Sequence, residues 1–328
     1  MADSKQGAKK QSKWVEIGLP LLIAAVLSGI GWYFFPPIMP HVQLPAEHVL
    51  EHPLLRLPGI WGDIYLTNTL VATLLIDAVL LGLVFVVQKA AKSGDLVPRG
   101  LAGVIEALLE AIYNLTETTA GKWTSTIFPY FATFFLVVLV ANWMELIPGV
   151  DSIGWLHHVE EGMHGFAAKG PFLVKQPGEY HVLAWVRVAS TDLNFTIALA
   201  LVSVFMTQVI GVRALGLPYF KKFFNIEAIF KVKPRYMGFI DFFVSLLEII
   251  SELAKIISFS FRLFGNLFAG SVMLFVLGYL VPILLQSAVL LLEAFVGIVQ
   301  ALVFGMLTLM FMALATHPHG GEHEEAHA

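Results

Sequence analysis

The sequence predicts an all-α polytopic membrane protein with six membrane helices. Of its 328 residues, 57% are hydrophobic and 13% are charged, and its mean hydropathy is +0.77. An average soluble domain has about 25% charged residues, and a soluble core of this size cannot bury so much apolar surface. The composition therefore excludes soluble enzymes, disordered chains and disulfide-stapled secreted modules.

Six stretches are long and apolar enough to cross a bilayer, which takes about 20 mostly apolar residues. They are residues 14–35, 64–88, 127–147, 193–212, 239–281 and 283–315. The first stretch could be a signal peptide, but it is long for one and lacks a small-residue cleavage site, so we expect a retained helix. With a cytoplasmic N-terminus, fourteen of the 20 Lys and Arg residues lie on the cytoplasmic side and four lie outside. This asymmetry predicts that both termini are cytoplasmic.

The chain divides into an N-terminal part (1–63) with an extra membrane helix and an external loop, a core (64–316) and a polar, His-rich tail (317–328). In the core, residues 101–121 have apolar side chains at helical spacing. They predict an amphipathic helix that either lies on the cytoplasmic face of the membrane or packs on protein. Residues 148–190 are expected to form a long external loop. The tail either binds a metal or is a solvated acidic segment.

The last two stretches are too long to stand upright in a bilayer. As single helices they would be roughly 65 Å and 50 Å long, whereas the hydrocarbon core is about 30 Å thick. Pro282 separates them and suits a turn. We therefore expect a hairpin (239–315) of two long, steeply inclined helices, whose broad lateral surface suits packing against another membrane body.

Polar residues recur every three or four positions along 239–281, which places them on one helix face. They are Glu248, Ser251, Lys255, Ser258, Arg262 and Asn266, with Glu252 beside them. Lys or Arg at a membrane helix centre costs about 2.5–3.5 kcal/mol, so this face must meet water, a partner charge or both. Arg262 stays protonated and is a good fixed charge for a mobile carboxylate to face. The alternative is an internal ion pair with Glu248 or Glu252, although Lys255 is nearer to both.

Other polar residues lie near the ends of neighbouring stretches. Glu293 and Gln300 share one face of the last helix. Asn142 and Glu145, and likewise Asp192 and Asn194, either line a polar inlet or act as interfacial caps. Small residues after Arg262 allow another helix to approach closely or serve ordinary bundle packing; they are Gly265, Ala269, Gly270 and Ser271.

The segment SFRLFGNLFAGSVML resembles the signature of subunit a of F-type ATP synthases. ANWMELIP, STDLNFT and LLEAFVGIVQALVFGMLT are similar to further motifs of this family, and the resemblance covers about residues 64–316. It implies a proton-translocating stator subunit, not catalytic by itself, that forms two offset half-channels and couples proton flow to ring rotation. The partners it implies are the c-ring, the peripheral-stalk b subunits, indirectly the soluble ATPase sector, and the lipid bilayer.

The resemblance also implies residue roles. Arg262 faces the carboxylate of the ring, and Glu248 belongs to the half-channel toward the cytoplasm. The half-channel from outside contains Asn266, Glu293 and Gln300, and its mouth contains Asn142, Glu145, Asp192 and Asn194. Lys255, Glu252 and Ser271 complete the polar set. Some bacterial relatives have an acid at the position of Ser271 and a His at that of Glu293, which implies that the acid has changed helix here.

Several other functions are disfavoured. The chain has no Cys and net charge −4, and none of its 11 His lies in an apolar stretch. These facts argue against thiolate, Fe–S and membrane-haem chemistry and against nucleic acid. The chain also has no GxxxxGK[ST] loop, so ATP chemistry must lie on partner subunits. We expect no cofactor on this chain. The competing function is a self-contained ion-coupled transporter or channel, which leaves the two overlong helices unexplained. With no Arg- and Ser-rich transit peptide, we expect a bacterial plasma membrane.

Overall fold

The computed structural model describes residues 18–20, 22–30, 33, 46–50, 52–56, 63–93, 99–158, 165–170, 172–223, 235–281 and 284–317. In these residues five helical segments are long and apolar enough to cross a membrane: residues 68–92, 101–146, 193–215, 242–280 and 285–315. The predicted all-α polytopic class is therefore confirmed. The first predicted span lies partly outside the described residues. Its described part is the shorter apolar helix Gly18–Ile30, so the count of six stays a prediction.

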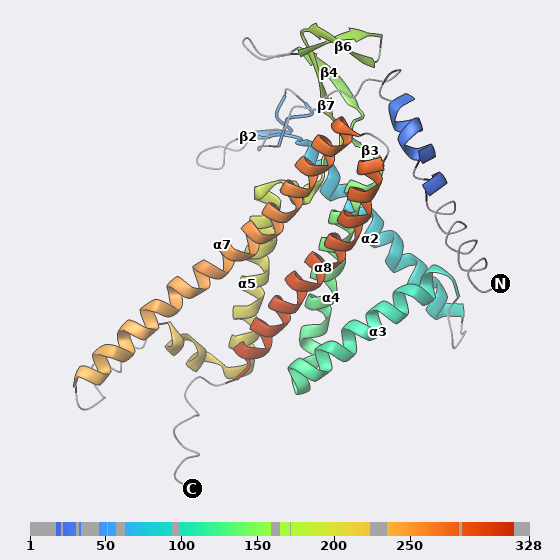
Figure 1. Ribbon diagram of the computed structural model, residues 1–328. Helices are drawn as coiled ribbons and strands as arrows, with labels where there is room; N and C mark the ends of the chain where they lie inside the picture. The colour runs from blue at the N-terminus through green and yellow to red at the C-terminus, as the bar shows by residue number, and fades with distance from the viewer. Residues whose placement is uncertain are drawn as a thin grey trace, which may run out of the picture. The chain divides into compact units, whose positions relative to one another are not determined.

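The chain forms two compact units. The first contains residues 1–71, 143–188 and 267–296, and the second contains residues 72–142, 189–266 and 297–328. Helices α7 (Arg235–Leu280) and α8 (Leu284–Ala315) contribute to both units. Figure 1 shows each of them as one continuous ribbon. At 1.5 Å per residue they are about 69 Å and 48 Å long. Their inclination to a bilayer stays a prediction. So does the turn at Pro282, because this residue lies outside the described residues.

The second unit is a packed helical assembly. It contains most of α2 (Asn68–Ser93), α3 (Leu101–Ala120), α4 (Thr124–Trp143) and α5 (Leu193–Leu215), with parts of α7 and α8. The ring of Phe304 on α8 lies 5.8 Å from Phe134 on α4 and 5.2 Å from Phe259 on α7. A hydrogen bond of 2.8 Å joins the hydroxyls of Ser203 on α5 and Thr308 on α8. These contacts fix the faces of the helices that carry the predicted polar residues.

Helix α3 confirms the helix predicted over residues 101–121. It buries one face, which contains Ala102, Ile105, Ile112 and Thr116, at spacings of three, seven and four. Val104 on the other side is 65% exposed. The buried face packs on protein, and whether the exposed face meets lipid headgroups stays a prediction.

The first unit contains a β-sheet that the sequence analysis did not predict. Strand β4 (Gly154–His158) pairs antiparallel with β7 (Tyr180–Ala184), and β5 (Gly165–Lys169) pairs with β6 (Phe172–Gly178), in the order β4-β7-β5-β6. The expected loop 148–190 is thus largely strand, drawn in green in Figure 1. Short strands interrupted by Gly and His give little period-two signal. A positive φ of 64° at Gly170 allows the tight turn between β5 and β6.

The same unit contains smaller extended elements. Strands β1 (Leu55–Arg56) and β2 (Asp63–Ile64) form a two-stranded antiparallel sheet. Strand β3 (Pro148–Asp151) follows the short 3-10 segment η2 (Met144–Leu146) at the end of α4. Asp151 accordingly lies where the chain passes from a membrane-length helix into the β-sheet region.

Candidate functional site

Arg262, on α7, has no carboxylate partner among the described residues. Its side chain is exposed, and its nearest polar partner is the Ser258 hydroxyl, at 3.5 Å. Among the described residues it forms no ion pair, and the next residue, Leu263, is fully buried. The internal ion pair with Glu248 or Glu252 is therefore not the arrangement found. The side chain of Arg262 therefore lies on the exposed surface of its unit.

One turn further along α7, a polar pair links the two long helices. The Asn266 amide donates a hydrogen bond of 2.8 Å to the Gln300 side-chain oxygen on α8. Gln300 is 4% exposed, and its amide nitrogen has no partner among the described residues. Asn266 and Gln300, predicted on adjacent helices, are thus in direct contact. The buried amide nitrogen of Gln300 is left as a hydrogen-bond donor without a partner among the described residues.

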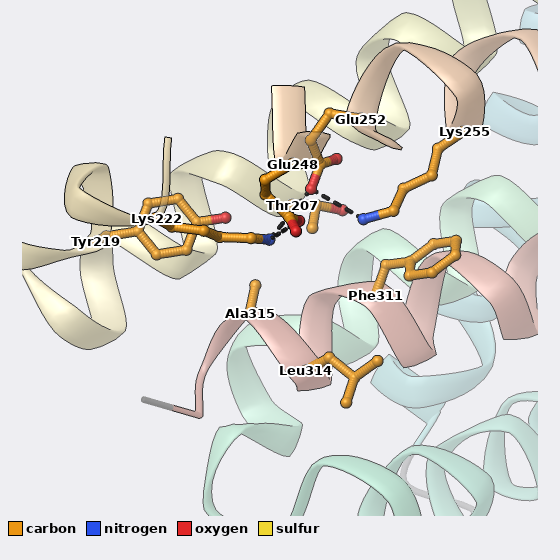
Figure 2. Close-up of a pocket in the computed structure, with 9 residues that line it drawn as sticks. All are labelled: Thr207, Tyr219, Lys222, Glu248, Glu252, Lys255, Phe311, Leu314 and Ala315. Carbon is orange, nitrogen blue, oxygen red and sulfur yellow. Dashed lines mark hydrogen bonds and ion pairs between the residues drawn. The ribbon is translucent and has the colours of Figure 1, made fainter. Parts of the chain in front are cut away.

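Four charged side chains gather around a cavity of about 180 Å³ in the second unit. Lys222, on the 3-10 segment η4 (Leu217–Lys222), has its ammonium nitrogen 2.7 Å from Glu248 Oε1 and 3.3 Å from Glu252 Oε1. Lys255 Nζ lies 2.8 Å from the same Glu252 oxygen. Figure 2 shows both lysines pointing at these carboxylates from opposite sides. We call these four residues the inner cluster.

Aromatic side chains form part of the wall of this cavity. The Tyr219 hydroxyl donates to Gln208 Oε1 at 2.6 Å, and its ring occupies space that a Cβ at Gly211 would need. Burial, and then the charges of Glu252 and Glu248, raise the pKa of Tyr219 to about 12. Lys255 Nζ lies 4.6 Å from the centre of the Phe311 ring, within cation–π range. The charged groups of the cavity are therefore bordered by the neutral hydroxyl of Tyr219 and by the aromatic rings of Tyr219 and Phe311.

A second group of acids lies in the first unit. Glu145 is 8% exposed and Glu293 is 6% exposed. Glu293 lies within electrostatic reach of Glu145, and the Ser271 hydroxyl lies beside the Glu145 carboxyl group. A Cβ at Gly270 would collide with the Glu293 carboxyl group. The acid on α8 therefore lies against α7 at Gly270, the residue before Ser271.

The side chains of Asn142 and Asp192 are buried, and both form hydrogen bonds within the protein. The Asn142 amide donates to the Gly297 carbonyl at 3.2 Å and accepts from the Ser190 hydroxyl at 2.8 Å. Asp192 is the N-cap of α5 and accepts a hydrogen bond of 2.9 Å from the backbone N–H of Asn194. The Asn194 side chain is exposed. Of the alternatives stated for these residues, the cap describes the contacts of Asp192 best.

Three residues that the structure places in or near these sites were not predicted from the sequence. Lys222 counted only as one of the cytoplasmic charges, and Tyr219 and Asp151 were not singled out. Asp151 has a φ of 61°, rare for a residue other than glycine, and burial raises its pKa to about 6 in spite of nearby Arg187. Spacing could not find Lys222, since its partners lie about 30 positions away on another helix.

Two other features stay without a role. Asp77 on α2 is exposed, and nothing in the described part of the chain assigns it a function. The polar tail is described only as far as His317, so the question of a metal in the tail lies outside the described residues.

Comparisons with known proteins identify the family to which the chain belongs. A sequence model of the family described as ATP synthase A chain matches residues 70–313. The ATP synthase subunit a of Moorella thermoacetica is 30% identical over 259 residues, which are 79% of this chain and 94% of the relative. The sodium ion specific ATP synthase subunit a of Propionigenium modestum is 28% identical over 279 residues, 84% of this chain and 83% of the relative.

A third relative is the chloroplastic ATP synthase subunit a of Stigeoclonium helveticum, 29% identical over 291 residues, which are 86% of this chain and 96% of the relative. The region matched by the family model contains Arg262, the inner cluster and the acids of the first unit. The chain therefore belongs to the subunit a family of F-type ATP synthases.

Proposed function

We propose that this chain translocates protons along two offset half-channels at the face of a c-ring and so couples proton flow to rotation of the ring. The observation that carries the proposal is the exposed Arg262, with no acid of the described residues to pair with. A guanidinium stays charged at any relevant pH, and a charge at membrane depth is costly without a partner. A carboxylate on another subunit would supply that partner.

The polar residues then fall into two pathways. From outside, a proton passes Asp192, Glu145, Glu293 and the Asn266–Gln300 pair, and it neutralises a carboxylate of the ring. Once neutral, that carboxylate can face lipid as the ring turns. On the inner side the next carboxylate releases its proton near Glu248. Arg262 holds the deprotonated carboxylate between the two pathways and prevents direct leakage from one to the other.

The membrane potential contributes to the free energy that drives rotation of the ring and ATP synthesis. One charge that crosses about 100 mV releases roughly 2.3 kcal/mol, so several crossings must add up for each ATP. The ATP chemistry itself belongs to the soluble ATPase sector, which the chain reaches only indirectly. The c-ring and the peripheral-stalk b subunits are the direct protein partners that we expect. The location that we propose is a bacterial plasma membrane, with both termini in the cytoplasm.

The test is an Arg262→Ala variant, assembled in its own complex and assayed in inverted membrane vesicles for ATP-driven proton pumping. We expect pumping to fall to the background of vesicles without the complex, while the amount of assembled complex stays the same. Arg213→Ala is the matched control, since Arg213 is exposed in the last turn of α5, and it should pump normally. Normal pumping by the Arg262→Ala variant would refute the proposed role.

Purification tests the competing function. A stator subunit should co-purify with a ring of small hairpin subunits and with a soluble ATPase. A self-contained transporter should instead be active as a purified single chain in liposomes. The comparisons do not favour that alternative, because the relatives are named as subunits of ATP synthase.

A further inference from the structure

Lys222 reaches the inner carboxylates from outside the helix that carries them. It ends η4, which follows α5, whereas Glu248 and Glu252 lie on α7. Its side chain is 11% exposed, and its ammonium nitrogen is the partner of both acids, at 2.7 Å and 3.3 Å. In the described part of the chain, Glu248 has no other cationic partner. The lysine therefore occupies one oxygen of this carboxylate as a cation would.

The two carboxylates of the inner cluster differ in how they are neutralised. Glu252 Oε1 is shared by Lys222 and Lys255 and is 2.8 Å from the latter. Glu252 thus keeps a cation if Lys222 leaves, and it still offers Lys222 an acceptor if Glu248 takes up a proton. Glu248 is more open, with 29% of its side chain exposed against 11% for Glu252. The cluster contains two acids and two lysines, so a proton on Glu248 makes Lys222 the surplus cation.

The backbone that carries Lys222 is anchored, while its side chain borders open space. Tyr219, three residues earlier, is 3% exposed and bonds to Gln208 on α5. The Lys222 ammonium lies 5.5 Å from the ring of Phe223, a second surface on which a displaced cation can rest. The cavity of about 180 Å³ beside it has room for water and for another rotamer of a flexible four-carbon side chain.

We propose that Lys222 is a tethered counter-ion that gates Glu248: paired with Glu248 it keeps that carboxylate free of protons, and displaced toward Glu252 alone it leaves the carboxylate open to a proton. This inference rests on the proposed role of Glu248 in the inner half-channel. The other titratable groups that face Glu248 among the described residues are Glu252, Lys255 and Tyr219. Lys222 is thus a positioning residue, since it acts through the carboxylate.

The experiment measures passive proton conductance across the pH range in inverted vesicles from which the soluble ATPase sector has been stripped. Lys222→Met keeps an unbranched, flexible side chain and removes the charge. We expect the pH of half-maximal conductance to rise by about one unit or more, because two carboxylates with one cation fewer hold a proton more tightly. Lys222→Arg should keep the parent profile. Lys122→Met is the control, since Lys122 is exposed on η1 (Gly121–Trp123).

An unchanged profile of Lys222→Met, at the same amount of assembled complex, would overturn the gate. If that variant does not assemble, Glu252→Gln decides instead. It removes the second carboxylate acceptor of Lys222, so we expect conductance to fall several-fold at every pH, and undiminished conductance would overturn the gate equally. A parent complex that conducts no protons at any pH would overturn the proposed function itself, and the gate with it.

Discussion

Arg262 and Lys255 lie seven residues apart on the same face of α7, about two turns, yet their environments are opposite. Lys255 has the Glu252 carboxylate at 2.8 Å and the Phe311 ring centre at 4.6 Å. Among the described residues, the polar contact of Arg262 is with the Ser258 hydroxyl, at 3.5 Å. Among the described residues, the polar stripe predicted from the sequence is therefore charge-balanced near the inner cluster and unbalanced at Arg262, which is where we propose a partner from another subunit.

Asp151 supplies a pH-dependent prediction at the same scale. Burial raises its pKa from the ordinary 3.8 to about 6, so the folded protein holds a proton there more tightly than the unfolded chain does. Above about pH 6 the buried charge costs stability, and the cost fades as the pH falls toward 4. Asp151→Asn removes the charge and tolerates the positive φ.

We therefore expect Asp151→Asn to raise the thermal unfolding midpoint of the purified complex above pH 6. Two units of pKa correspond to at most about 3 kcal/mol, and the gain should shrink as the pH approaches 4. The measurement is the midpoint of parent and variant across this pH range. A gain of the same size at every pH, or a loss above pH 6, would contradict this explanation.

The helices could be predicted from the sequence, whereas the four-stranded sheet could not. The apolar lengths of α2, α5, α7 and α8 gave their positions to within a few residues, because a membrane helix is recognised by composition alone. Strands β4 to β7 are short and contain Gly and His, and their pairing joins residues far apart in the sequence, such as Gly154 with Ala184. Neither periodicity nor composition encodes such a pairing.

In the first unit, α7 and α8 approach closely at Gly270 and Glu293, and this contact can be tested by substitution. Gly270→Ala puts a methyl group where the Glu293 carboxyl lies, so that side chain must move. Overpacking of this kind costs about 1–3 kcal/mol. We expect slower proton entry with the complex still assembled, measured as the initial rate of ATP-driven pumping. Gly82→Ala on α2 is the control, since nothing lies within 4 Å of the added methyl group there; equal rates for both variants would count against a role for Glu293.

The polar residues of the membrane helices could be predicted from the sequence, but most of their side-chain contacts with distant parts of the chain could not. It placed Asn266 and Gln300 on facing helices, and they form a hydrogen bond. It also placed Glu248 and Glu252 in the membrane but could not find Lys222, because that contact depends on how the segment after α5 folds back against α7. Contacts between distant parts of the chain require the packed structure, whereas faces of helices follow from spacing.

Disulfide crosslinking can show whether Arg262 faces a carboxylate of another subunit, because the chain has no Cys of its own to compete with an introduced one. Gly265→Cys lies one turn after Arg262, with nothing within 4 Å of its Cβ position. It would be combined with a Cys beside the ring carboxylate of the c subunit, and Val84→Cys on the exposed side of α2 is the control. We predict that oxidation links Gly265→Cys to the c subunit and leaves Val84→Cys unlinked. An assembled complex in which Gly265→Cys forms no such link, or in which Val84→Cys forms it equally, would contradict the account.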